Sequence, residues 1–226
     1  MSILILRLEG PLQSWGEHSV YYQEGDTATM PTKSGIVGLL ACALGISKEE
    51  SAEIAALTDA LTIGIRAERP GKNLIDLHTT GAKRLQTAEH GTRKEMKSTI
   101  CAHKQYLEDA AFTVALTSND ESLLKHLADA LQHPSWSIFL GRKSCVPTRP
   151  VFESLLDGNS LLDALKTVPV LPQRPTKEPA KTLTVELEES IPHGVGLFRQ
   201  DIPSERSRYF YSRLVHRIQI PIPIGA

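Results

Sequence analysis

The sequence predicts an α+β fold, a ferredoxin-like (RRM-like, βαββαβ) palm with one large insertion. Two observations predict it. Short apolar runs of strand length alternate with helix-length segments that carry apolar residues on one face. In addition, about 40 residues separate the second and third predicted strands, where this plan normally has a short hairpin.

The first half of the palm is predicted as strand, helix, helix and strand. Residues 3–8 are rich in Ile and Leu, which is typical of a buried strand. Ser34 is expected to cap the first helix, and Gly45 stands where a helix-ending glycine belongs. Ser47 opens a capping box, SKEE, which predicts a second helical piece to about residue 60. The β-branched alternation of residues 62–68 predicts the second strand.

The second half of the palm repeats this pattern. Residues 111–116, AFTVAL, predict the third strand. Ser118 opens another capping box, and the helix after it places its leucines on one face. Pro134 is expected to end that helix. Residues 136–140 are then predicted to form the fourth strand.

The insertion carries most of the positive charge in this region. Between residues 66 and 104 there are nine Lys/Arg and four Asp/Glu, a local net charge of +5 in a chain whose net charge is −1. A structureless loop of this length is unusual inside a domain, so we expect a long hairpin that contacts an anionic partner. We therefore assign residues 1–69 and 110–150 to the palm and residues 70–109 to an inserted basic thumb between strands two and three. Residues 151–226 are assigned to a small irregular or β C-terminal extension that packs on the palm.

Composition narrows the class of protein. The 226 residues are 41% hydrophobic and 23% charged, as in soluble globular proteins. No apolar run reaches the roughly 18 residues of a membrane span, and the N-terminus does not look like a signal peptide, so a cytoplasmic protein without a membrane partner is expected. The three cysteines, Cys42, Cys101 and Cys145, form no Cys-x-x-Cys pair. We expect no metal site and no cofactor.

Two short motifs are candidates for phosphate contacts. Lys33 and Ser34 lie at the start of the first helix, where free N–H groups and the positive end of the helix dipole attract anions. No glycine stands five residues before Lys33, so a nucleotide-hydrolysing loop is not expected. Arg142 and Lys143 follow a glycine that permits a tight turn. Simple helix capping and an exposed turn are the respective alternatives.

Trp15 is the aromatic side chain best placed in a loop to stack on a base of single-stranded RNA. Filling the core is an equally good explanation for it. The predicted sheet offers few stacking residues, with Phe112 in the third strand and no aromatic residue in the first. RNA would therefore bind through loops and the insertion.

A metal-free ribonuclease needs a base, an acid and a cationic stabiliser. The candidates in or beside the insertion are His78, His90, His103, Lys104 and Tyr106. The same residue types are common on RNA-contacting surfaces without chemistry. No His-x-Glu motif or paired Asp indicates a metal nuclease.

The chain resembles the CRISPR-associated RAMP proteins that cap the 5′ end of a guide RNA. The resemblance rests on LEGPLQSWG at residues 8–16 and PTKSGIVGLL at residues 31–40. YLEDAAFTVAL at residues 106–116 and LGRKSC at residues 140–145 resemble the capping subunit of type I-E Cascade in particular. DLHT, residues 76–79, resembles the start of that subunit's thumb, whereas residues 84–98 depart from its pattern. The likeness weakens after residue 150 and returns around Arg199 and Arg206.

This resemblance implies a non-catalytic, structural RNA-binding subunit. Such proteins hold the crRNA 5′ handle, abut the first Cascade backbone subunit (CasC-like) and contact the large PAM-reading subunit (CasA-like). They meet target DNA only indirectly, through the complex. Relatives in type I-C systems cut the repeat RNA themselves, so a metal-free endoribonuclease that processes CRISPR repeat RNA is the alternative. The residues expected to contact RNA are Gln13, Trp15, Lys33, Ser34, His78, Lys83, Arg84, Lys97, Lys104, Arg142, Lys143, Ser144, Arg149, Arg199 and Arg206.

Overall fold

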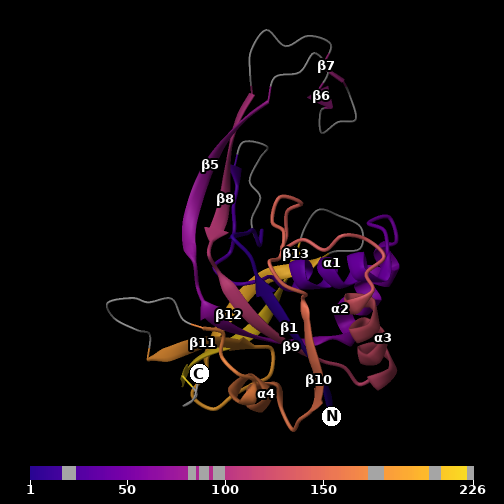
Figure 1. Cartoon of the computed structure of the whole chain (residues 1–226), viewed down its shortest axis with the longest axis vertical. Helices are drawn as coiled ribbons and strands as arrows, with labels where there is room; N and C mark the ends of the chain where they lie inside the picture. Colours follow the sequence, from indigo (N-terminus) through magenta and orange to yellow (C-terminus); the bar gives the residue numbers. More distant parts are fainter. Residues whose placement is uncertain are drawn as a thin grey trace.

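The computed structural model is a mixed α/β structure whose sheets are mostly antiparallel (Figure 1). It describes residues 1–16, 24–80, 85–86, 92–93, 100–172, 181–203 and 210–222. The expected RNA contacts Lys83, Arg84, Lys97 and Arg206, and the nuclease candidate His90, lie outside the described residues. No described helix is long and apolar enough to cross a membrane.

A seven-stranded sheet forms the body of the molecule. Its order is β10 (Phe152–Asp157), β1 (Ser2–Glu9), β9 (Ala111–Thr117), β4 (Thr62–Arg69), β11 (Thr182–Leu187), β13 (Phe210–Pro221) and β12 (Val195–Pro203). Every neighbouring pair in this order is antiparallel. The strands predicted at residues 3–8, 62–68 and 111–116 are confirmed as β1, β4 and β9.

Helices cover both faces of this sheet, so its central strands are apolar on both sides. Helices α1 (Lys33–Leu44), α2 (Ser51–Ala60) and α3 (Glu121–Gln132) cover one face, and α4 (Leu161–Thr167) covers the other (Figure 1). Along β1, Leu4 and Leu6 belong to the core under α1 and α3. Ile3 and Ile5 point to the core under α4. Successive strand residues face opposite sides, which explains why the run at residues 3–8 is continuously apolar.

The predicted helices are confirmed, but their first residues are corrected. Thr32, not Ser34, is the N-cap of α1, and its hydroxyl accepts a hydrogen bond from the backbone N–H of Gly35. Asp120, not Ser118, caps α3 in the same way. Helix α2 begins at Ser51 rather than directly after Ser47. Gly45 ends α1 as expected, in the left-handed conformation with φ of 79°.

The strand predicted at residues 136–140 is wrong, because this segment is a loop. Leu140 in this segment donates its N–H to the carbonyl of Cys145 and accepts at its carbonyl from the N–H of Ser14. The fourth strand beside β1 is instead β10, which starts at Phe152. Leu140 is buried and Ile138 packs against the core without a neighbouring strand, whereas Trp136 is exposed.

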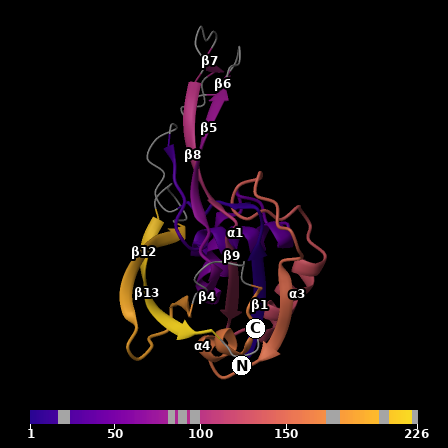
Figure 2. The same cartoon turned by 60° about the vertical axis from the view of Figure 1, so that its left-hand side comes forward.

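Two long strands leave the body as a projecting hairpin, β5 (Lys72–Thr80) and β8 (Ile100–Glu108), drawn at the top of Figures 1 and 2. The short strands β2 (Leu12–Gln13) and β3 (Glu24–Gly25) pair with β8. Further along the chain, β6 (Leu85–Gln86) pairs with β7 (Thr92–Arg93). A β-hairpin therefore occupies the place where the sequence predicts an inserted hairpin.

Gly71 and Asp109 mark the two points where this hairpin joins the sheet. Both have positive φ, 76° and 58°. A Cβ atom on Gly71 would come within 2.8 Å of both the Cβ of Ala110 and the carbonyl oxygen of Glu108. Only glycine satisfies the backbone angle and the close crossing together.

Replacing Gly71 with valine is therefore expected to lower the free energy of unfolding by about 2–3 kcal/mol. Urea denaturation followed by circular dichroism measures the change. Gly38→Ala is the matched control, because Gly38 lies in α1 with nothing within 4 Å of its Cβ position. That control is expected to keep or slightly raise stability. An unchanged midpoint for Gly71→Val would contradict this account of the junction.

The strands of residues 151–226 do not form a separate sheet. Strands β10, β11, β12 and β13 all belong to the seven-stranded sheet, β10 at one end and the other three beside β4. The division into palm, thumb and extension stays a prediction.

A buried ion cluster lies on the α4 side of the sheet. One carboxylate oxygen of Glu68 accepts hydrogen bonds from Arg7 (3.1 Å), from Arg66 (2.6 Å) and from the hydroxyl of Thr113. Both arginines also donate to the carbonyl of Pro169, just after α4. The cluster therefore holds α4 on the sheet.

Candidate functional site

An open pocket of about 290 Å³ lies where the projecting hairpin meets the body. Four segments form it: the loop at residues 14–16, residues 25–26 at the end of β3, the start of α1 and the turn at residues 141–142. Its lining residues are Ser14, Trp15, Gly16, Gly25, Asp26, Thr32, Ser34, Gly35, Gly141 and Arg142. The pocket thus brings together three residues expected from the sequence, Trp15, Ser34 and Arg142.

Arg142 supplies the positive charge of this pocket. Its guanidinium donates to the backbone carbonyls of Gln105 (3.1 Å) and Asp26 (3.4 Å), and its Cζ lies 4.9 Å from the centre of the Tyr106 ring. These described partners are dipoles and a π face, which orient the cation without neutralising it. An anion in the pocket would meet a fixed, half-buried guanidinium.

Two glycines bring the walls of the pocket together. Gly141 has φ of 93°, and a Cβ there would overlap the carbonyl oxygen of Ser14. The tight turn predicted at Gly141 is confirmed, closed by the N–H of Leu140 donating to the carbonyl of Cys145 at 2.7 Å. A Cβ on Gly35 would lie 2.7 Å from the indole ring of Trp15. The backbone of the turn therefore packs on the backbone of the loop, and the backbone of the helix start packs on the Trp15 ring.

Trp15 fills the core, which is the alternative given for it above, and the RNA contact expected of Gln13 is corrected because its side chain is buried. Trp15 is 1% exposed and Gln13 is 0% exposed. The indole N–H donates to the side-chain oxygen of Gln13, and the amide of Gln13 donates to the carbonyls of Leu8 and Ala110. Both residues fix the loop that forms one wall of the pocket.

The phosphate contact expected of the Lys33 side chain is also corrected, because this side chain points into the protein. Its Nζ donates to the carbonyl of Leu61 (2.8 Å) and pairs with Glu188 (2.9 Å). Its backbone N–H donates to the carboxylate of Asp201 (2.7 Å), so the start of α1 already holds an anionic group from the same chain. Ser34 stays at the pocket, with its hydroxyl 3.3 Å from that of Thr32.

Two further arginines predicted to bind RNA are engaged in ion pairs. Arg199 is buried against Glu186, with two guanidinium nitrogens 3.0 and 3.2 Å from carboxylate oxygens. Arg149 pairs with Glu153 at 2.7 Å. Arg199 is therefore structural, and Arg149 is partly neutralised. Lys143 and Ser144 are exposed beside Arg142, as the prediction requires.

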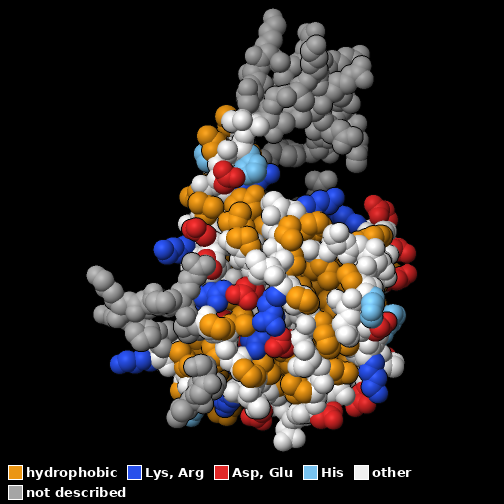
Figure 3. All heavy atoms as spheres, viewed as in Figure 1, with side chains coloured by type: hydrophobic (Ala, Val, Ile, Leu, Met, Phe, Trp, Pro, Cys, Tyr) orange, Lys and Arg blue, Asp and Glu red, His pale blue; other side chains and the backbone are white. Residues whose placement is uncertain are grey.

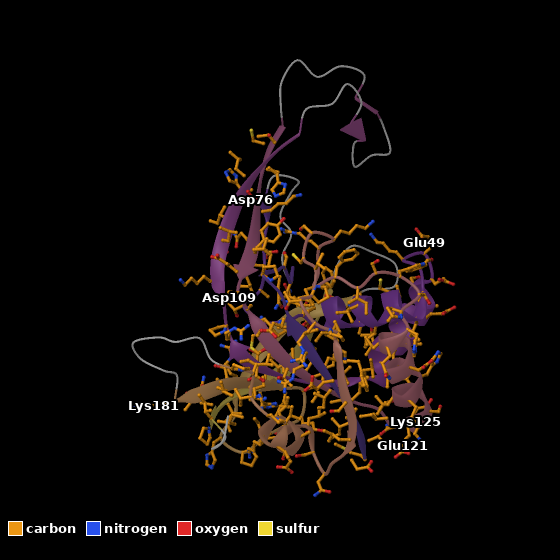
Figure 4. The ribbon with its side chains drawn as sticks, in the orientation of Figure 1. Glu49, Asp76, Asp109, Glu121, Lys125 and Lys181 are labelled. Atoms are coloured by element: carbon orange, nitrogen blue, oxygen red, sulfur yellow. The ribbon has the colours of Figure 1, made fainter. Side chains whose placement is uncertain are left out.

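The two faces of the projecting hairpin separate the nuclease candidates. The register pairs Asp76 with Lys104, so these residues share a face with His78 and Tyr106. On that face His78 lies 2.7 Å from Asp76 and 3.5 Å from the hydroxyl of Tyr106. His103 is on the opposite face, so the four candidates do not form one cluster. Figure 4 labels Asp76 midway along this hairpin and Asp109 at its base.

Charge on the visible surface is mixed. Figure 3 shows Lys and Arg side chains next to Asp and Glu over the body, with histidine on the upper part of the projecting hairpin. Among the described residues no group of His, Cys, Asp and Glu is arranged to hold a metal ion.

Sequence reasoning missed the residues that orient the expected ones. Asp26, Thr32 and the backbone of Gln105 shape the pocket. Asp201 accepts from the backbone N–H of Lys33, and Glu188 pairs with its Nζ. Thr32 had a signal, since it is a good N-cap residue one position before the helix. Asp201 and Glu188 had none, because more than 150 residues separate each of them from Lys33.

Comparisons with known proteins place the chain among CRISPR-associated proteins. A family model described as "CRISPR-associated protein (Cas_Cas5)" matches residues 3–216. The "CRISPR system Cascade subunit CasD" of Escherichia coli (strain K12) is 34% identical over 158 residues, which are 67% of this chain and 70% of that protein.

Solved structures agree with this result. A chain of a "CRISPR RNA-guided surveillance complex" is 31% identical with a TM-score of 0.77, over 98% of this chain and 91% of that one. A chain described as "Crystal structure of Cas protein" is 33% identical with a TM-score of 0.70, over 99% and 98% of the two chains. The resemblance stated from residues 8–16 and 31–40 is confirmed.

Proposed function

Because the chain belongs to the Cas5 family of CRISPR-associated proteins, we propose that it is a structural subunit of a type I-E Cascade effector that holds the 5′ handle of the guide RNA. The observation that carries the proposal is Arg142, a guanidinium fixed in an open pocket by carbonyls and an aromatic ring. RNA phosphates are ligands for such a cation, and the exposed Lys143 adds a second charge next to Arg142 in the chain.

The fold supports this assignment. Strands β1, β4, β9 and β10, with α1 after β1 and α3 after β9, follow the order of a ferredoxin-like palm. The projecting hairpin takes the place of the thumb. RNA that leaves the pocket would run along the hairpin face with His78 and Lys104. The protein would act in the cytoplasm, beside a backbone subunit and the large PAM-reading subunit.

The geometry of the described candidate groups supports a non-catalytic role. Tyr106 is buried under Arg142, and His103 lies on the other face of the hairpin from His78 and Lys104. A concerted acid–base cleavage needs its groups around one phosphate. We therefore propose that these residues contact RNA and that another subunit cuts the repeat.

The test replaces Arg142 and Lys143 with alanine in the complex co-expressed with its neighbouring subunits and guide RNA. Loss of charge-assisted bonds of about 1.5–3 kcal/mol each is expected to weaken guide retention at least tenfold. The slope of log affinity against log salt is expected to fall by roughly 0.7 for each lost phosphate contact. Lys125→Ala is the matched control, because Lys125 is exposed on α3 and lies away from the hairpin (Figure 4).

Unchanged retention in the double variant would place the handle elsewhere. Incubating the purified protein with its repeat RNA in EDTA tests the alternative function. Specific cleavage under these conditions would make the chain a metal-free endoribonuclease instead.

A further inference from the structure

The hairpin of β12 and β13 has an unusual distribution of side chains. Its register places Phe198 directly opposite Leu214, with Phe210 on the same face at the start of β13. We call these three residues the outer apolar face. They are 78%, 45% and 41% exposed. In Figure 2 the hairpin, orange to yellow, forms the flank of the body opposite α3.

The charged residues of the hairpin lie on the other side. Arg199 pairs with Glu186, and Arg213 pairs with Asp201 at 2.6 Å and with Glu188 at 3.1 Å. Burial lowers the pKa of Arg213, but hydrogen bonding and the charge of Asp201 outweigh this and leave that pKa raised. Antiparallel sheets with one solvated face normally turn polar residues outward. Here apolar residues point outward and charges inward.

This inversion indicates a protein partner rather than RNA. The other described residues on the outer side include Gly196, Gln200, Pro203, Ser212 and His216, and no Lys or Arg is among those that the structure describes there. Proteins that bind single-stranded nucleic acid combine aromatic stacking with cations along the backbone. The outer apolar face has aromatic rings without the cations.

The size of the face argues against self-association. Its exposed area is on the order of 300 Å², taking about 150–250 Å² for each large side chain. A stable dimer needs about 800 Å² from each copy. The face fits the apolar centre of a larger interface, as in a complex whose subunits are also joined by RNA.

We propose that the outer apolar face docks an uncharged, apolar surface of another protein subunit of the same guide-RNA complex; this rests on the function proposed above. The face is also tied to the pocket. Asp201 lies in β12 and holds the backbone N–H of Lys33, while Thr32 and Ser34 on either side line the pocket. Docking would therefore steady the start of α1 where RNA binds.

The test introduces Phe198→Glu together with Leu214→Lys in the co-expressed complex. Both side chains point to solvent, so folding is expected to be kept, and circular dichroism with thermal melting checks it. On affinity purification, the amount of one protein subunit that copurifies with the variant is expected to be at least tenfold lower than with the wild type. Phe198→Leu keeps the face apolar and should retain that subunit. Trp136→Glu controls for an exposed aromatic residue elsewhere.

Three results would overturn the docking proposal. Full assembly of the Phe198→Glu, Leu214→Lys variant with every subunit would overturn the docking proposal. A wild-type chain that is dimeric in light scattering, with a monomeric variant, would show that a second copy covers the face and would also overturn it. Direct RNA crosslinks to Phe198 would do the same. Failure of the Arg142 test alone would remove the handle site and leave the docking result standing, so the two proposals fail separately.

Discussion

Replacing Glu68 with alanine is expected to lower the free energy of unfolding by about 3–5 kcal/mol, the largest effect that we predict for a single substitution. Glu68 is fully buried, and one of its oxygens accepts from Arg7, Arg66 and Thr113. Without it, two buried guanidiniums lose their central counter-charge. Burial already lowers the pKa of Arg7, against the opposing effect of the Glu68 charge.

The consequence extends to α4. Arg66 donates to the carbonyls of Leu165 and Val168 at the end of that helix, and both arginines donate to Pro169. If the arginines move toward water, these carbonyls lose their donors and the helix detaches from β4 and β9. Chemical denaturation measures the loss, and amide exchange of residues 161–168 locates it.

Glu153→Ala is the matched control for this prediction. Glu153 pairs with Arg7 at 3.6 Å but is partly exposed, so about 1 kcal/mol or less is expected. If Glu68→Ala and Glu153→Ala cost the same, the buried cluster does not anchor α4. Glu68→Gln, which keeps the shape, is expected to fall between the two.

The sheet was predictable as far as burial is encoded in neighbouring residues. The continuous apolar runs of β1 and β9 predict strands covered on both faces, and both are central strands of the sheet. Residues 136–140 show the same local signal without a partner strand. Their hydrogen-bond partners, Ser14 and Cys145, are set by the turn at Gly141 and by the N-terminal loop. Local pattern contains no information on which edge the next segment reaches.

The candidate site shows the same limit for side chains. Arg142 was predictable, because a glycine turn followed by two basic residues indicates a cation near the surface. Lys33 and Arg199 have the same charge but are bound by carboxylates from distant strands. A single sequence shows how many charges a segment has, but it does not show which are paired. The resemblance to a known family supplied the function, whereas the pairing came only from the structure.

Asp201→Ala is expected to lower the free energy of unfolding by about 2–4 kcal/mol, because the backbone N–H of Lys33 loses its acceptor and Arg213 loses Asp201 and keeps Glu188. The same change should create an anion site. The vacated place has the N-terminus of α1 on one side and the Arg213 guanidinium on the other, which is the arrangement that binds sulfate or phosphate. At the start of α1, where the sequence predicts a phosphate contact, the protein's own Asp201 carboxylate accepts from the backbone N–H of Lys33.

Thermal melting in sulfate and in chloride of equal ionic strength measures both effects. Sulfate stabilises proteins in general, so the wild type sets the baseline response. The Asp201→Ala variant is expected to gain several degrees more than the wild type at millimolar sulfate, and the double variant with Arg213→Met should lose that excess. An equal sulfate response in the wild type and in Asp201→Ala would mean that the carboxylate does not stand in for an anion. The start of α1 would then be held by the hairpin of β12 and β13 for stability alone, with no latent phosphate site beside the pocket.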